Sequence, residues 1–218
     1  EKVSYGITTG FGKFSDVVIS KKDTRQLQIN LIRSHACGVG DPLSEEIVRA
    51  MMLLRINALS KGYSGIRLET LQILIDMLNK GVHPIVPEKG SLGSSGDLAP
   101  LSHMVLTMLG EGEAIYKGAR MDSKDAMEKA GIKPLEYLSS KEGLSLNNGT
   151  QCMTAVGVIT VYDAINLMKT ADIALGLTME GLNGITCAMD ERVNLVRPHK
   201  GQFNTANNVL EILQGSEM

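Results

Sequence analysis

A short segment near the middle of the chain carries the residue types with the clearest chemical potential. Residues 90–103 read GSLGSSGDLAPLSH, so that small residues stand directly before an apolar stretch. One interpretation is a flexible turn whose glycines permit positive φ, with Asp97 as the N-cap of a helix. A second interpretation is a bend that brings the amide nitrogen of Gly96 against the carbonyl carbon of Ser94, two residues back.

The second interpretation amounts to a self-cyclisation of the backbone. Attack of the Gly96 nitrogen on the Ser94 carbonyl, with loss of water, would close a five-membered ring. Loss of a further water from Ser95 would leave an exocyclic methylene, an electron-poor alkene. Glycine suits the attacking position because it has no Cβ to obstruct the bend, and Ser94 supplies only its carbonyl. Spacing alone favours the simpler capped turn.

Helical periodicity dominates the elements that must position this segment. Asp41 followed by Pro42 predicts an N-cap and a first helical residue. Gly81 ends an apolar series with helical spacing that begins at Leu71. Together with the capping role of Asp97, these signals predict helices over 42–61, 71–80, 98–109, 123–130 and 150–182.

The segment 150–182 is the longest of these helices and is apolar on nearly every face, with isolated charges at Asp163, Lys169 and Asp172. A helix of this kind must be surrounded by other helices. It could reach roughly 45 Å, longer than a small domain is wide. The pattern therefore predicts the middle of a long bundle shared between subunits. The charge-free run 143–162 is too polar to span a bilayer, so we expect a soluble protein with no membrane partner.

Composition and charge exclude several classes of protein. Of the 218 residues, 43% are hydrophobic and 21% are charged, as in ordinary globular proteins. Only two short extended pieces are predicted, 82–86 and 192–196, and neither a repeat nor a linker divides the sequence. We therefore expect a single mainly helical unit over 1–218. A net charge of −2 argues against a protein that binds nucleic acid by neutralising phosphates.

Cysteine and histidine spacing argues against a disulfide framework and a metal site. Cys37, Cys152 and Cys187 are widely separated, and the four histidines lack the spacing of a zinc site. We expect structural histidines, no metal, and reduced thiols in a cytoplasmic protein. The start of the chain has no signal-peptide pattern.

Segment 90–103 resembles the prosthetic-group motif of the histidine and aromatic amino acid ammonia-lyases. Segments 5–12 (YGITTGFG), 148–151 (NGTQ) and 197–202 (RPHKGQ) are similar to the same family, in the same order. The resemblance implies a mainly α fold, a long-helix bundle of the ammonia-lyase (aspartase/fumarase-like) type with a small loop-rich N-terminal active-site region. The region that bears the prosthetic group would cover about 1–145, and residues of about 146–218 would form the start of the central helical bundle.

The resemblance also implies a set of site residues. Ser94, Ser95 and Gly96 would form 4-methylidene-imidazol-5-one (MIO), a protein-derived group that needs no metal. The family usually has Ala where this chain has Ser94, a change that ring closure should tolerate. Tyr5 falls on the catalytic base, and Asn148 falls on an active-site asparagine that contacts the substrate or the prosthetic group.

The implied substrate rests on His35. Histidine-specific members resemble the Ser-His-Ala pattern at 34–36, so the resemblance favours L-histidine, with urocanate formed once Tyr5 removes the β-proton. A phenylalanine or tyrosine ammonia-lyase or a 2,3-aminomutase is the alternative within this chemistry. An inactive helical assembly fragment is the alternative outside it. Asn147 and Asn194 depart from the residues that the family usually has at these positions.

Members of this family are more than twice as long as this chain. Family elements that carry an Arg for the substrate carboxylate, a second Tyr and an acidic residue are absent, so we expect a fragment of a longer lyase. The resemblance further implies a homotetramer with shared active sites, or a second chain that carries the missing C-terminal half.

Overall fold

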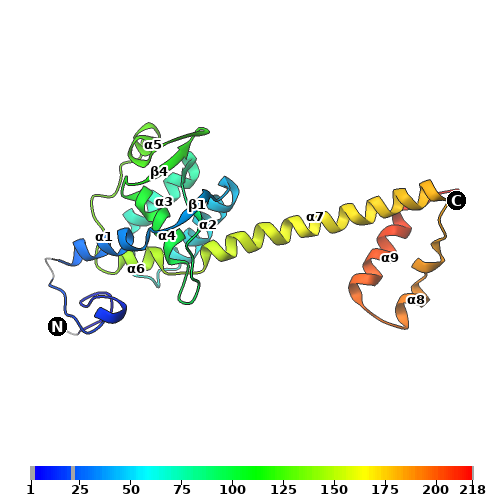
Figure 1. Cartoon of the computed structure of the whole chain (residues 1–218), viewed down its shortest axis with the longest axis horizontal. Helices are drawn as coiled ribbons and strands as arrows, with labels where there is room; N and C mark the ends of the chain where they lie inside the picture. Colours follow the sequence, from blue (N-terminus) through cyan, green and yellow to red (C-terminus); the bar gives the residue numbers. More distant parts are fainter. Residues whose placement is uncertain (1–2, 21–22, 218) are drawn as a thin grey trace. The chain divides into compact units, whose positions relative to one another are not determined.

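The computed structural model describes residues 3–20 and 23–217, and the chain divides into two compact units. The first unit ends at Gly157 and the second begins at Val158. Figure 1 traces the helices of the first unit along the sequence. These are α1 (Thr24–His35), α2 (Glu45–Leu59), α3 (Leu68–Lys80), α4 (Leu98–Met108), α5 (Ser123–Lys129), α6 (Glu142–Asn147) and the start of α7 (Gln151–Leu182).

Local sequence signals set the bounds of several helices. The Gly81 φ of +74° ends α3 in the left-handed conformation that the apolar spacing and glycine predict. The predicted helices over 98–109, 123–130 and 150–182 are confirmed within two residues as α4, α5 and α7. Helix α1 and the short helix α6 were not predicted.

The predicted start of α2 at Asp41 and Pro42 is wrong. Ser44 is the N-cap, and its hydroxyl accepts a hydrogen bond from the Ile47 N–H at 3.4 Å. Residues Val39–Pro42 instead form β1, antiparallel to β3 (Pro87–Lys89). A proline is tolerated in this two-stranded sheet because it lies at a strand end. The pairing partner is far along the chain, so local capping signals could not reveal it.

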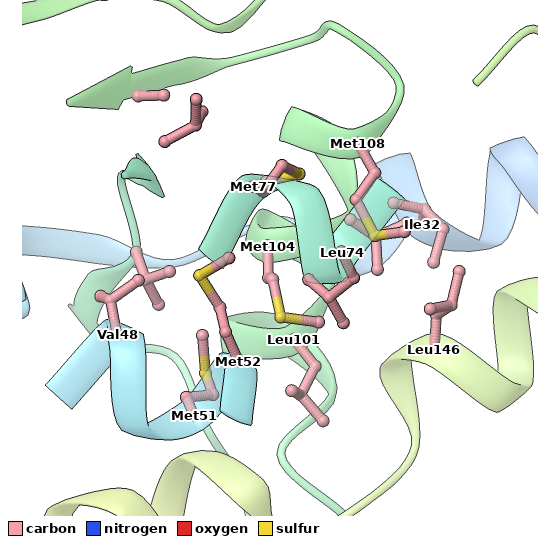
Figure 2. Close-up of a cluster of buried hydrophobic side chains, with 14 of the residues drawn as sticks. Ile32, Val48, Met51, Met52, Leu74, Met77, Leu101, Met104, Met108 and Leu146 are labelled. Carbon is pink, nitrogen blue, oxygen red and sulfur yellow. The ribbon is translucent and has the colours of Figure 1, made fainter. Parts of the chain in front are cut away.

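A hydrophobic core built largely from methionine and leucine fixes α4 in place (Figure 2). Helix α4 packs against α1, α5 and α6. The fully buried residues of this core come from several helices and include Ile32, Met51, Met52, Leu74, Met77, Leu101, Met104, Met108 and Leu146. Each such side chain contributes about 1.5–3 kcal/mol through burial. The start of α4, which follows the 90–97 segment, is therefore held firmly.

A small antiparallel sheet completes the first unit, with the strand order β2 (Val82–Pro84), β4 (Glu113–Tyr116), β5 (Ala119–Asp122). The extended piece expected at 82–86 is thus present at β2. The β4–β5 hairpin was not predicted, although Lys117 and Gly118 both have positive φ, as two-residue hairpin turns require.

The second unit contains the remainder of α7, the 3₁₀ helix Thr186–Met189, α8 (Glu191–Leu195) and α9 (Lys200–Ile212). Met179, Val209 and Leu213 form its small core. The extended piece expected at 192–196 is wrong, because Asp190 caps α8 by accepting a hydrogen bond from the Arg192 N–H at 2.8 Å. A capped first turn favours helix over strand.

Helix α7 exposes large apolar side chains within the second unit, among them Val161, Leu167 and Leu177. By length and composition alone, Glu142–Leu182 is apolar enough to cross a membrane, with a mean hydropathy of 1.2 over the best window. The expectation that the start of this stretch is too polar for a bilayer is therefore not confirmed. Core helices of soluble proteins pass the same test.

Candidate active site

The segment before α4 forms a tight bend. Gly93 and Ser94 each pair with Gly96 across it. The Gly96 φ is +103°, in the region that favours glycine. Ser94 and Ser95 are exposed, and within residues 3–20 and 23–217 neither hydroxyl makes a hydrogen bond. The bend thus brings Ser94 and Gly96, which flank Ser95, into the pairing that the predicted ring closure needs.

Asn148 and Gly149, between α6 and α7, lie directly against Gly96. A Cβ placed on Gly96 would lie 2.6 Å from the Asn148 Oδ1 and 2.9 Å from the Gly149 N. The Asp97 N–H also donates a hydrogen bond to the Gly149 carbonyl at 2.7 Å. Two predicted site segments that are about fifty residues apart in the sequence therefore meet at this contact.

Asp97 anchors the bend by binding to α7. Its side chain is 2% exposed, its Oδ1 accepts from the Ser91 hydroxyl at 2.9 Å, and its Oδ2 accepts from the Met153 N–H at 2.8 Å. Asp97 stands at the N-cap position of α4 but makes no side-chain hydrogen bond there. The predicted N-cap position is confirmed, but the side-chain capping bond is not made, because the carboxylate satisfies an N–H in the first turn of α7 instead.

Cys152 lies beside this carboxylate and is also buried. Burial, with a further contribution from the charge of Asp97, raises the pKa of the Cys152 thiol to about 11. The thiol is therefore protonated at neutral pH and is not a nucleophile.

Arg55 binds the residues at the break between α6 and α7. It lies on the buried face of α2 and is 4% exposed. Its Nη1 donates to the Gln151 Oε1 at 2.7 Å, and its Nη2 donates to the Asn148 carbonyl at 3.0 Å and to the Ser145 carbonyl. Burial lowers the pKa of Arg55 to about 10, so the guanidinium remains charged at neutral pH.

Gly149 is packed tightly between these groups, because a Cβ there would overlap the Arg55 Nη1 and the Gln151 Oε1. Sequence reasoning missed Arg55. The available signal was an arginine in register with buried apolar positions of α2, at Met51, Met52 and Leu59.

His35 occupies the last turn of α1 and is half-buried. Its Nδ1 lies 2.8 Å from the Leu31 carbonyl, to which it donates, and this leaves the Nε2 open for another partner. The chain that follows is tied to the start of the 90–103 segment, because a Cβ on Gly90 would lie 2.9 Å from the Gly38 Cα. The Gly38 N–H also donates to the His103 Nε2 on α4 at 3.0 Å.

Tyr5 lies in the N-terminal loop, where its hydroxyl accepts from the Gly12 N–H at 3.2 Å and its ring packs edge-to-face on Phe11. The Ser140 hydroxyl donates to the Ile7 carbonyl at 3.2 Å, which ties this loop to the residues before α6. In the described part of the chain, neither Tyr5 nor His35 makes a hydrogen bond to residues 94–96. The structure therefore brings Asn148 to the bend but leaves Tyr5 and His35 outside that contact.

A groove of about 310 Å³ borders the bend, with Leu92, Gly93, Cys152 and Val156 among its mainly apolar lining. Asn147, one of the positions that depart from the family pattern, is fully buried, and its amide donates to the Ser102 hydroxyl at 3.2 Å. No group of three or more metal-binding side chains occurs among the residues that the structure describes.

Comparison with known proteins decides the family. The model for aromatic amino acid lyases matches residues 1–218. The chain belongs to this family. It is similar to the histidine ammonia-lyases of Alkaliphilus oremlandii (69% identical) and Clostridium tetani (62% identical), each over 99% of this chain and 42% of the relative. This family member thus spans about two fifths of the length of these curated relatives.

Solved structures agree with the family assignment. The phenylalanine aminomutase of Pantoea agglomerans matches with a TM-score of 0.92 and 39% identity, over 99% of this chain and 41% of that one. The histidine ammonia-lyase of Trypanosoma cruzi matches with a TM-score of 0.88 and 41% identity, over 95% and 40%. The predicted mainly α fold of the ammonia-lyase type is confirmed.

Proposed function

We propose that this chain is part of a carbon–nitrogen lyase that eliminates ammonia from L-histidine to give trans-urocanate. The observation that carries the proposal is the bend at Ser94, Ser95 and Gly96, packed without room for a Cβ against Asn148. Curated relatives that are 56–69% identical are named histidine ammonia-lyases, which supports histidine as the substrate.

The residues present fit an MIO group. Ser94 and Gly96 already pair in the bend, Gly96 has a positive φ, and among the described residues the Ser95 hydroxyl makes no hydrogen bond. In ring closure, the Gly96 nitrogen bonds to the Ser94 carbonyl carbon, and that carbonyl oxygen leaves as water with the amide protons of Gly96 and Ser95. The Ser95 hydroxyl then leaves as a second water with its own Cα proton, which forms the methylidene.

Once formed, the group would supply an electrophilic carbon toward the substrate amine, which would make that amine a better leaving group. Tyr5 removes the β-proton at its phenolic oxygen, which the hydrogen bond from the Gly12 N–H orients. His35 offers its Nε2 to the substrate imidazole, because its Nδ1 is held by Leu31. Asn148 provides a polar contact beside Gly96.

The working assembly in this proposal is a homotetramer with shared active sites, or a pairing with a second chain that carries the remaining residues. The exposure of the bend in the single chain supports it. We also propose a cytoplasmic enzyme, because all three cysteines are free.

A phenylalanine or tyrosine enzyme is the second candidate, because aminomutases with these substrates share the fold at 39% identity. A substrate panel separates the candidates. The histidine lyase releases urocanate from L-histidine alone, whereas the alternatives release cinnamate, coumarate or β-amino acids.

The deciding experiment compares two neighbouring serines in the complete enzyme. Ser95→Ala should abolish urocanate production and retain at least the mass of the second water, because the hydroxyl that leaves to form the methylidene is absent. Ser94→Ala is the matched control and should keep both the dehydrated mass and turnover, since only the carbonyl of residue 94 takes part. A wild-type protein whose intact mass shows no loss of two waters would overturn the proposal and favour an inactive assembly fragment.

A further inference from the structure

Arg55 is a buried cation that has no acidic partner in residues 3–20 and 23–217. Among the described residues no carboxylate lies within ion-pair distance of it, and its Nε has no hydrogen-bond partner. An unpaired buried charge costs free energy unless other groups satisfy it. Here three oxygens do so, the Gln151 side chain and the Ser145 and Asn148 carbonyls.

Those oxygens all belong to the α6–α7 junction. Ser145 lies in the last turn of α6, Asn148 follows that helix, and Gln151 begins α7. The last carbonyls of a helix have no partner within it and carry partial negative charge. The guanidinium therefore ties the end of one helix to the beginning of the next across the residue that faces the bend.

We propose that Arg55 is a positioning residue of the lyase site, which acts by holding the Asn148-Gly149 turn against Gly96. The inference rests on the proposed function. The Asn148 carbonyl is bound to Arg55 while its Oδ1 faces Gly96, and the Gly149 carbonyl is bound to the Asp97 N–H. A shift at Arg55 is therefore transmitted to the active-site amide within the same residue.

The planar fork of arginine is needed for this role. Its two terminal nitrogens reach three oxygens at once, which the single ammonium of a lysine cannot reproduce. In the complete enzyme, Arg55→Lys should keep the fold and the charge while lowering kcat on L-histidine about a hundredfold, the cost of a misplacement near 1 Å. Arg49→Lys, an exposed change on the same helix, is the matched control and should leave kcat unchanged.

A double-mutant cycle distinguishes the positioning role of Arg55 from a purely structural one. If Arg55 acts through Asn148, Arg55→Lys should cost far less in an Asn148→Ser background than in the wild type. Equal losses in both backgrounds would overturn the inference. If Asn148→Ser leaves too little activity to measure, hydrogen exchange decides, because only local loosening raises exchange at the Asp97 N–H while the Leu101 N–H in α4 stays protected.

Gln151→Leu removes the side-chain oxygen that accepts from the Arg55 Nη1, and it should also lower kcat. This variant keeps the inference testable if Arg55→Lys does not fold. Activity of Arg55→Lys and Gln151→Leu equal to that of Arg49→Lys would overturn the inference while leaving the proposed function intact. A rise in amide hydrogen exchange throughout the Arg55→Lys protein, together with a lower unfolding midpoint, would also overturn the inference. A wild-type enzyme that releases no urocanate from L-histidine would instead overturn the proposed function itself.

Discussion

Replacing Gly96 by alanine tests whether the bend is shaped by its contact with Asn148. The substitution imposes two separate costs. A side chain at a φ of +103° is strained by about 1–3 kcal/mol. The new Cβ would also lie 2.6 Å from the Asn148 Oδ1 and 2.9 Å from the Gly149 N, an overpacking that costs a further 1–3 kcal/mol, roughly.

Comparison with Gly93→Ala isolates the cost of the collision with Asn148 and Gly149. Gly93 shares the bend and has a φ of +75°, but a Cβ there would meet nothing within 4 Å. The two variants therefore share the strain and differ in the collision. We expect Gly96→Ala to be less stable than Gly93→Ala by about 1–3 kcal/mol.

The assay is urea unfolding of the complete enzyme at fixed protein concentration, with intact mass to report ring closure. The intact mass of Gly96→Ala should still include both waters, because the ring does not close. The intact mass of Gly93→Ala should be lower by two waters, as in the wild type. Equal stability of the two variants, or a dehydrated Gly96→Ala, would refute the contact and with it the placement of Asn148.

Three further outcomes are expected. Asp97→Ala should lower the unfolding free energy in urea by about 1–3 kcal/mol and reduce the dehydrated fraction by mass, because the Met153 N–H loses its acceptor. His35→Ala should lower kcat/KM for L-histidine about 10–100-fold while sparing other amino acids, and an equal loss on all of them would indicate a packing role. Glu142→Gln should destabilise the protein by about 3 kcal/mol in urea unfolding at neutral pH. Burial alone would raise the pKa of Glu142, but hydrogen bonds from Arg67 and other donors outweigh it and lower that pKa, so the difference should shrink as the pH falls below about 4.5.

Elements fixed by local signals could be predicted from the sequence, whereas long-range partners could not. The apolar spacing of α3 and the glycine at its end identify it correctly, since both signals act within a few residues. Asp97 shows the opposite case. A small acidic residue before an apolar run is the usual sign of an N-cap, yet its side chain binds the first turn of a helix 56 residues further along.

The candidate site divides in the same way. Motif resemblance placed Asn148 in the site, and the structure supplies the contact with Gly96 that the spacing could not provide. Arg55 escaped notice because its partners lie 90 or more residues away and none of them is acidic. Among the described residues, Tyr5 and His35 make no hydrogen bond to residues 94–96, so the motif resemblance alone places these two side chains in the site.

The break between α6 and α7 explains why fold and site are hard to separate. Asn148 is extended, with φ −101° and ψ 107°, so the helix is interrupted and backbone hydrogen bonds are lost. Arg55 satisfies carbonyls on the α6 side, and the Asp97 carboxylate satisfies an N–H on the α7 side. Asn148, the residue that leaves the helical conformation at this break, is the one that faces Gly96. A substitution that made residues 148–150 helical and joined α6 to α7 would therefore regain backbone hydrogen bonds and move the Asn148 amide away from Gly96.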